Sequence, residues 1–363
     1  MGRLTKIECT VRFVTPAFLG GADQSAQWRT PPFKALIRQW WRVAECAGQK
    51  PNTSLLHERE GELFGRATDK GTTASHVRLR LSDWRGGEIS KSLWKPNVGT
   101  VKHPEVQKPP QIGADLYLGF GPLEAGGLKR ESAIEPGQIR RLLLGFPEQE
   151  AARFSTVMCL VHLLGAIGSR CRNGWGSLDF DQGGLSKEQL ASILQPDNTA
   201  AREWLRAMAR PWQKALDTDW CHAIGLSNDD DKRLLLWRTE KPQPWQDVLR
   251  VLANVKIAYR TQFHFQGGGQ HNNLCDRQVL AYPVTRHTLG AWGQDQRSAN
   301  QILFKVLPEP KGYVGIVAHM PHGLPRLLAA RLNEKDRANL TTRETEVWKQ
   351  VHAVLDKKLI RLP

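Results

Sequence analysis

The 363-residue sequence predicts an α+β fold built from two tandem βαββαβ units with insertions. Three observations predict it. Short segments alternate apolar and polar residues, as half-buried strands do. Longer segments repeat apolar residues at helical spacing. The two kinds of segment follow one another in a similar order in each half of the chain, although the second copy is the weaker one.

The first unit opens with a strand and a helix. The alternating strand, within residues 4–15, places four apolar side chains on one face: Ile7, Cys9, Val11 and Phe13. The helix begins near Thr30, which fits an N-cap, and Pro31, which fits the first helical position. Its apolar residues recur at helical spacing: Phe33, Leu36, Ile37, Trp40 and Ala44.

The remaining elements of the first unit lie on either side of an insert at about 83–112, with the second strand before it and the other elements after it. We expect a second strand with Val77, Leu79 and Leu81 directed inward, and a helix over about 148–166 with Phe154, Val157, Val161 and Leu164 on one stripe. The segments "ADLYLGF" and "WGSLDF" are the predicted third and fourth strands. The resulting order, β-α-β-β-α-β, is the ferredoxin-like arrangement shared by RRM domains.

The second unit follows a helical connector. Its predicted elements are a strand "KRLLLWR", a helix "PWQDVLRVLANVKIAYR", paired strands "NQILFKVL" and "GYVGIVAH", a helix "TRETEVWKQVHAVLDKK" and a terminal strand "LIRL". The polar, glycine-rich stretch 264–278 predicts a mobile loop. We therefore expect an N-terminal domain at 1–182, a connector at 183–230 and a C-terminal domain at 231–363.

The chain is strongly basic. It carries 51 Lys and Arg against 36 Asp and Glu, a net charge of +15. Residues 1–180 contribute 25 − 17 = +8, so both halves share the excess. Positive charge spread over folded domains favours a polyanionic partner, most often nucleic acid. The alternative is charge that serves solubility alone.

Other features exclude several classes of protein. The six cysteines are far apart and form no C-x-x-C pair, so we expect neither a zinc site nor another metal or cofactor. No P-loop, dinucleotide-binding motif or nucleophile elbow occurs. The absence of a signal peptide and of a long apolar run predicts a cytoplasmic protein with reduced thiols and no membrane partner.

Lys34, Arg38 and Arg42 lie at i, i+4 and i+8 of the first helix and form a cationic stripe beside Trp40 and Trp41. Like charges at this spacing repel one another, and an anionic partner would remove that repulsion. We interpret the stripe as a phosphate-contacting face. A solvated basic face with packed indole rings is the alternative.

The loop "IGSRCRNGWGSL" combines flexible backbone with positive charge. Gly168, Gly174 and Gly176 permit positive φ and close approach of the backbone. Basic and polar residues there fit phosphate binding: Ser169, Arg170, Arg172 and Asn173. Trp175 either stacks on a base or plugs the core of a tight turn.

Catalytic candidates are few. His264 and His271 in the glycine-rich stretch could serve as general acid or base for RNA cleavage. Asp23 is the best single carboxylate for metal-assisted cleavage, although no paired carboxylate accompanies it.

The segments "TPAFLGGAD" (15–23), "RTPPFKALIRQWWRVA" (29–44) and "ELFG" (62–65), with the glycine-rich loop 168–177, resemble the RAMP superfamily of CRISPR systems. Within it they are similar to the first-subunit family of the type III-B Cmr effector complex. The sequence departs from that family at Ala35, where glycine is frequent, and in having fewer glycines in the loop. The resemblance is specific over 1–180 and architectural beyond about 230.

The resemblance implies a non-catalytic RNA-binding subunit without a cofactor, whose partners are CRISPR RNA, single-stranded target RNA and other RAMP subunits. The implied RNA contacts are Arg29, Lys34, Arg38, Trp41, Arg42, Ser169, Arg170, Arg172, Asn173 and Trp175. Two alternatives stay open. One is a RAMP-type endoribonuclease for guide processing or target cleavage, and the other is an RRM-like protein outside CRISPR.

Overall fold

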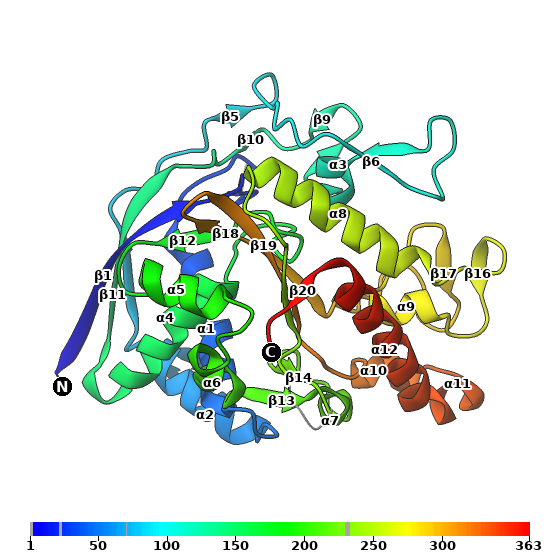
Figure 1. The fold of residues 1–363 in the computed structure, drawn as a ribbon. Helices are drawn as coiled ribbons and strands as arrows, with labels where there is room; N and C mark the ends of the chain where they lie inside the picture. Colours follow the sequence, from blue (N-terminus) through cyan, green and yellow to red (C-terminus); the bar gives the residue numbers. More distant parts are fainter. Residues whose placement is uncertain (1–2, 22–23, 70, 229–232) are drawn as a thin grey trace.

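The computed structural model describes residues 3–21, 24–69, 71–228 and 233–363. The predicted α+β class is confirmed, because helices pack against two four-stranded sheets, one in each half of the chain (Figure 1). Within the described ranges, no helix combines the length and apolar character that crossing a bilayer requires.

The N-terminal sheet is antiparallel, with strand order β12-β1-β11-β4. Its strands are β1 (Leu4–Phe13), β4 (Arg78–Leu81), β11 (Ile139–Pro147) and β12 (Leu178–Phe180). In its register Ile7 lies opposite Leu144, and Val11 opposite Phe180. The helices α1 (Thr30–Cys46) and α4 (Ala151–Leu164) pack on each other and share one apolar core with the sheet. The apolar faces predicted for β1, α1 and α4 are buried there, except for Ile7, which is half-buried.

Two predictions for this half are wrong. The segment "ADLYLGF" forms a helix, α3 (Ala114–Gly119), in which Ala114 and Leu118 are buried one turn apart, and the third strand is β11. A seven-residue apolar run does not separate strand from helix by its period. The N-cap of α1 is Arg29 rather than Thr30, and its side chain forms no capping hydrogen bond.

Small elements connect the larger ones. The helix α2 (Thr53–Phe64) packs on α1. Six two-residue or three-residue strands form hairpins or pairs between β4 and β11: β5 (Ile89–Ser90), β6 (Thr100–Lys102), β7 (Gln111–Gly113), β8 (Leu123–Glu124), β9 (Gly127–Leu128) and β10 (Ser132–Ala133). A further hairpin pairs β2 (Arg66–Thr68) with β3 (Gly71–Thr73). The connector contains α5 (Lys187–Leu194), α6 (Glu203–Arg206), β13 (Ala209–Pro211), α7 (Trp212–Leu216) and β14 (Ile224–Leu226).

The second sheet has strand order β18-β19-β15-β20 and is also antiparallel. Its strands are β15 (Leu236–Arg238), β18 (Ile302–Glu309), β19 (Gly312–His319) and β20 (Ile360–Arg361). They carry the helices α8 (Trp245–Thr261) and α12 (Leu340–Lys358) on one face. The stretch 264–278 contains β16 (Gly269–His271), which pairs with β17 (His287–Leu289), and the first residues of α9 (Asp276–Leu280). Two short helices, α10 (Arg326–Ala330) and α11 (Glu334–Ala338), precede α12.

The second sheet is buried on both faces. Ile302, Phe304 and Val306 of β18 belong to the core formed with α8 and α12, whereas Leu303 and Leu307 belong to the core of the N-terminal half. The alternation follows from the two-residue period of a strand. The two halves therefore pack through this sheet rather than through a loose linker.

The glycine-rich loop lies along the outer edge of β18. The Phe304 N–H donates to the carbonyl oxygen of Arg172 at 2.9 Å, and the Val306 N–H donates to Ser177 Oγ at 3.0 Å. Lys305 Nζ donates to the carbonyl oxygen of Leu178 at 2.6 Å and to that of Gly165. The loop thus covers an edge strand whose backbone groups would otherwise lack partners.

Candidate functional site

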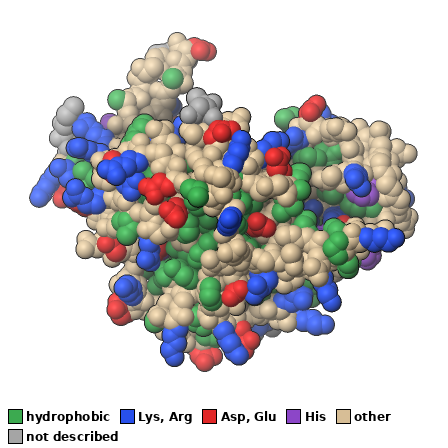
Figure 2. Space-filling view, turned by 90° about the horizontal axis from the view of Figure 1, so that it is seen from above, with side chains coloured by type: hydrophobic (Ala, Val, Ile, Leu, Met, Phe, Trp, Pro, Cys, Tyr) green, Lys and Arg blue, Asp and Glu red, His purple; other side chains and the backbone are tan. Residues whose placement is uncertain are grey.

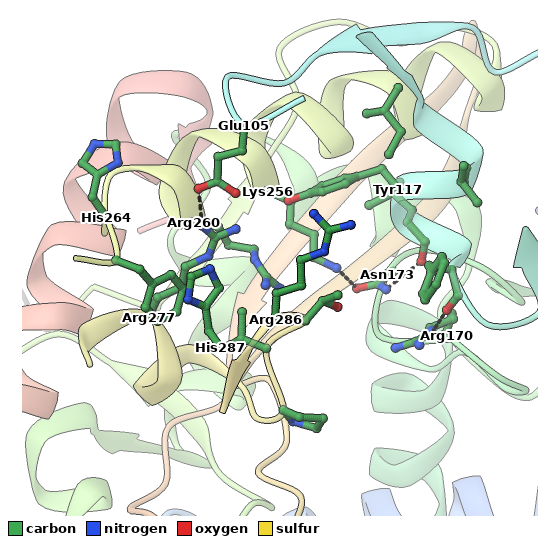
Figure 3. Close-up of a pocket in the computed structure, with 18 of the residues that line it drawn as sticks. Glu105, Tyr117, Arg170, Asn173, Lys256, Arg260, His264, Arg277, Arg286 and His287 are labelled. Carbon is green, nitrogen blue, oxygen red and sulfur yellow. Dashed lines mark hydrogen bonds and ion pairs between the residues drawn. The ribbon is translucent and has the colours of Figure 1, made fainter. Parts of the chain in front are cut away.

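A cleft of about 730 Å³ opens where the insert, the glycine-rich loop and the second half meet. Figure 3 shows the polar side chains that line it. Five are cationic and one is a carboxylate: Arg170, Lys256, Arg260, Arg277, Arg286 and Glu105. Figure 2 shows Lys and Arg side chains spread over the face seen from above, so positive charge alone does not distinguish the cleft from the rest of the surface.

The single carboxylate is already paired. Glu105 forms an ion pair with Arg277. Burial would raise the pKa of Glu105, but the hydrogen bond and charge of Arg277 outweigh it and lower that pKa. Among the described residues, Lys256, Arg260 and Arg286 form no ion pair, and Arg170 donates only to the carbonyl oxygen of Phe120, at 2.6 Å. The cleft consequently keeps an excess of positive charge.

Lys256 forms the floor of the cleft. Its side chain comes from α8, is 7% exposed, and its Nζ donates to Oδ1 of Asn173 at 2.9 Å. Nζ also lies 5.6 Å from the centroid of the Tyr117 ring. Burial, with the nearby charges of Arg260 and Arg170, holds the pKa of Lys256 well below its ordinary value. A buried ammonium without a carboxylate is costly, because desolvation is only partly offset.

Two cationic residues of the cleft have strained backbones. The φ angles are 61° at Arg170 and 63° at Arg286, in the left-handed region that non-glycine residues seldom adopt. Such strain costs of order 1–3 kcal/mol per residue and concentrates at functional sites. The fold thus holds both guanidinium groups at the cleft at the expense of local stability.

Aromatic rings form one wall. The rings of Phe265 and His287 stack with centroids 3.7 Å apart, and His271 Nε2 lies 3.0 Å from His287 Nδ1. Burial, together with the proximity of His271 and Arg277, lowers the pKa of His287 and so favours its neutral imidazole. His264 is exposed at the same wall. A cationic floor beside flat rings suits a phosphate chain carrying bases.

The cationic stripe of α1 lies outside this cleft, and an internal carboxylate occupies it. Arg38 and Arg42 both pair with Glu60 of α2, with 2.7 Å between Arg42 Nη2 and Glu60 Oε1. Lys34 Nζ donates to Ser75 Oγ at 2.8 Å. The anionic partner that the stripe requires is therefore supplied within the fold.

The two tryptophans predicted to contact RNA are both buried in the structure. Trp41 and Trp175 are 1% and 0% exposed, so neither offers a face to a base. Trp175 packs against Phe18, with ring centroids 5.2 Å apart, and against Trp94. The sequence left two roles for Trp175, stacking on a base or filling the core. In the structure its side chain fills the core.

The loop glycines approach protein rather than a free surface. Gly168, Gly174 and Gly176 have φ angles of 101°, 89° and 63°, which agrees with their expected conformational role. A Cβ at Gly176 would lie 1.9 Å from the carbonyl oxygen of Ile167, and one at Gly168 would lie 2.9 Å from that of Phe18. These glycines therefore allow the loop backbone to approach other backbone of the same protein.

The other predicted residues divide between cleft and junction. Arg170 and Asn173 line the cleft, and Asn173 Nδ2 donates to the carbonyl oxygen of Leu118 at 2.7 Å. Arg172 instead turns to the second half, where its Nη1 donates to the carbonyl oxygen of Asn300. Ser169 Oγ accepts from Arg130 at 3.1 Å, and Arg29 is half-buried at the start of α1.

Of the catalytic candidates, His264 lines the cleft and His271 contacts it through His287. Asp23 lies outside the described residues. The sequence analysis missed Lys256, Arg260 and Arg286 as cleft residues. The sequence pattern of α8 could have indicated Lys256. This lysine follows Leu249 and Leu252 at helical spacing and therefore interrupts the buried apolar stripe of the helix.

Comparison with known proteins supplies the family. A family model of the RAMP superfamily matches residues 10–179. This part of the chain belongs to the RAMP superfamily. The predicted membership is confirmed, and the RAMP match runs from within β1 to within β12, so it includes β4, β11 and the whole glycine-rich loop.

Two solved structures are similar to this protein over nearly its whole length. Cmr1 from Pyrococcus furiosus, in its apo form, has 12% identity and a TM-score of 0.44, covering 94% of this chain and 96% of that chain. A chain of the type III-B Cmr-beta complex bound to cognate target RNA has 12% identity and a TM-score of 0.44, covering 95% and 99%. No curated protein sequence matches the chain.

Proposed function

We propose that this RAMP protein is a non-catalytic RNA-binding subunit of a type III-B CRISPR effector complex. Its cleft holds single-stranded guide or target RNA through the sugar–phosphate backbone. Its partners are CRISPR RNA, target RNA and other RAMP subunits of the complex. Because guide pairing supplies sequence recognition in RNA-guided complexes, the subunit needs no base-specific contacts.

One observation carries this proposal. Four cationic side chains, Arg170, Lys256, Arg260 and Arg286, face one cleft and form no ion pair among the described residues. Their charge is left for a polyanion, and the ring wall at Phe265 favours one that carries bases. Membership of the RAMP superfamily and the Cmr-like motifs at 15–23, 29–44 and 62–65 support the choice of complex.

We also infer that both halves are ferredoxin-like. Numbered within each half, the strand orders β12-β1-β11-β4 and β18-β19-β15-β20 are both 4-1-3-2, read from opposite ends. In each half one helix follows the first strand and another follows the third. This is the arrangement of a βαββαβ unit, and it supports domains at 1–182 and 231–363 joined by the connector.

The test is binding of a fluorescent single-stranded RNA to the full-length protein across a salt series. The double variant Arg260→Glu/Arg286→Glu should bind at least about tenfold more weakly and show a shallower salt slope, because fewer counterions are released. Arg78→Glu/Arg80→Glu, on the exposed side of β4 and outside the cleft, changes the net charge equally and serves as the control. Equal loss in both variants would refute a specific site.

Cleavage is followed in the same samples, because His264 and His271 lie at or beside the cleft. We expect intact RNA with and without divalent cations. Cleavage that disappears in His264→Ala or His271→Ala, or in Asp23→Ala with metal present, would favour the endoribonuclease alternative instead.

A further inference from the structure

The floor of the cleft has the features of a site for one discrete anionic group. In its protonated form Lys256 carries three N–H donors, and only one of them, to Asn173 Oδ1, is accounted for among the described residues. The amide of Asn173 is fixed in orientation, because its Nδ2 donates to the carbonyl oxygen of Leu118. Lys256 is therefore held in place while its remaining donors have no partner in the part of the chain that the structure describes.

The surroundings of Lys256 select the kind of anion. Arg170 and Arg260 lie close enough to disfavour its charge, so the floor suits a group with several oxygens that several cations share. Figure 3 shows Arg286 extending into the cleft between Lys256 and His287. A phosphate group fits this arrangement better than a carboxylate, which has two oxygens and a single charge.

The size of the cleft selects an unpaired nucleotide. A volume of about 730 Å³ lies within the range of small-molecule sites. A duplex presents its phosphates on the outside of a much wider cylinder, with its bases stacked inside, so it reaches neither the floor nor the ring wall. A single splayed-out nucleotide reaches both, with its phosphate on the floor and its base beside the Phe265–His287 stack.

We propose that Lys256 and Asn173, with Arg170, Arg260 and Arg286, form a dedicated site for the phosphate group of one unpaired nucleotide, whose base lies against the wall of Phe265 and His287. The inference rests on the proposed RNA-binding function and deepens it, because it names one nucleotide as the specific occupant. The phosphate is either an internal phosphodiester or a terminal phosphomonoester.

Occupancy of the site has a proton signature. In the free protein, burial disfavours the charged form of Lys256. A phosphate bound at Nζ favours that charged form, so binding above the lowered pKa takes up a proton from the buffer. A ligand held only by arginines takes up none, because arginine stays protonated.

Calorimetric titration of the full-length protein tests the proposal with four probes: uridine, 5′-UMP, 3′-UMP and the dinucleoside monophosphate UpU. Titrations are run in Tris and in Hepes, whose ionisation enthalpies differ. We expect at least one phosphate-bearing probe to bind saturably and at least about tenfold more tightly than uridine. Its apparent binding enthalpy should differ between the two buffers, because the buffer supplies the proton that is taken up. Preference for UpU over both UMP isomers assigns the internal phosphodiester, and the reverse assigns a terminal phosphate.

Two variants assign the effect to the floor. Lys256→Met should abolish both phosphate preference and proton uptake. Asn173→Asp should do the same while keeping the packing of Lys256, since its carboxylate occupies the ammonium. Thermal unfolding checks that each variant folds. If long single-stranded RNA binds but the phosphate-bearing probes bind no better than uridine, or bind without proton uptake, the nucleotide site is refuted and the RNA-binding function stands. If long RNA also fails to bind, the proposed function fails as well.

Discussion

Asn173 and Lys256 meet across the junction between the two halves of the protein, with 2.9 Å between Oδ1 and Nζ. Asn173 belongs to the glycine-rich loop, within the residues that match the RAMP superfamily, and Lys256 belongs to α8 of the second half. The same loop accepts hydrogen bonds from β18 through Arg172 and Ser177. The cleft is therefore a product of the junction, and neither half would form it alone.

Neighbouring arginines of the loop should behave differently when replaced. Arg170→Ala should weaken RNA binding and reduce the salt slope by about 0.7, the contribution of one contact to single-stranded RNA. Arg172→Ala should leave RNA affinity nearly unchanged and lower the free energy of unfolding by about 1 kcal/mol, because it loses the hydrogen bond to Asn300. Anisotropy titrations and urea unfolding of both variants provide the measurements; a reversed pattern would contradict the assignment.

Glu60→Gln should destabilise the protein by about 2 kcal/mol, because it leaves Arg38 and Arg42 without their charge partner in a half-buried site. Burial would raise the pKa of Glu60, but Arg42 and Arg38 outweigh it and lower that pKa. The stabilisation is thus complete above about pH 4.3, the unfolded value, and disappears as the pH falls through the lower folded value.

Chemical denaturation between pH 3 and 7 should show wild type and Glu60→Gln converging at the acid end. The same variant separates two roles of the stripe. If α1 contacts RNA, the arginines freed by Glu60→Gln should strengthen RNA binding. We expect instead that the variant binds RNA with unchanged affinity, because the stripe lies outside the cleft.

Lys305→Met should remove a pH dependence of stability. Burial lowers the pKa of Lys305 to about 7, only partly opposed by Asp179. Between about pH 7 and the unfolded value of about 10.4, the unfolded chain binds the additional proton, so wild-type stability gains up to about 1.4 kcal/mol per pH unit from this group. Urea unfolding from pH 7 to 9 should give a shallower rise for Lys305→Met, and parallel curves would show that Lys305 stays charged in the folded protein.

Gly176→Ala should cost at least about 3 kcal/mol, because its Cβ would lie 1.9 Å from the backbone carbonyl oxygen of Ile167, a buried residue. Gly267→Ala is the matched control: its φ is also positive, 80°, but nothing lies within 4 Å of the added Cβ. That variant should cost about 1–2 kcal/mol, the strain of the left-handed conformation. Thermal unfolding compares the two, and similar losses would mean that strain alone governs the loop.

The local patterns of the sequence predicted most of the fold. Alternation identified β1 and β4, and helical spacing identified α1, α4, α8 and α12, since each buries one face whose period depends only on local geometry. Short apolar runs gave no such period. "ADLYLGF" was therefore assigned the wrong type, and "IRRLLLGFP", the strand β11 at the centre of the sheet, was missed.

The candidate site divides in the same way. The sequence by itself determined the family and the excess of positive charge, and it placed Arg170 and Asn173 among the candidate site residues. These depend on composition and on contiguous motifs. Only the tertiary structure decided that Glu60 pairs with the arginines of the cationic stripe and that Trp175 is buried. It also decided that Lys256 lies at the floor of the cleft beside Asn173, although the two residues are 83 positions apart in the sequence. Contacts between distant segments follow from how whole elements pack, and no local spacing encodes them.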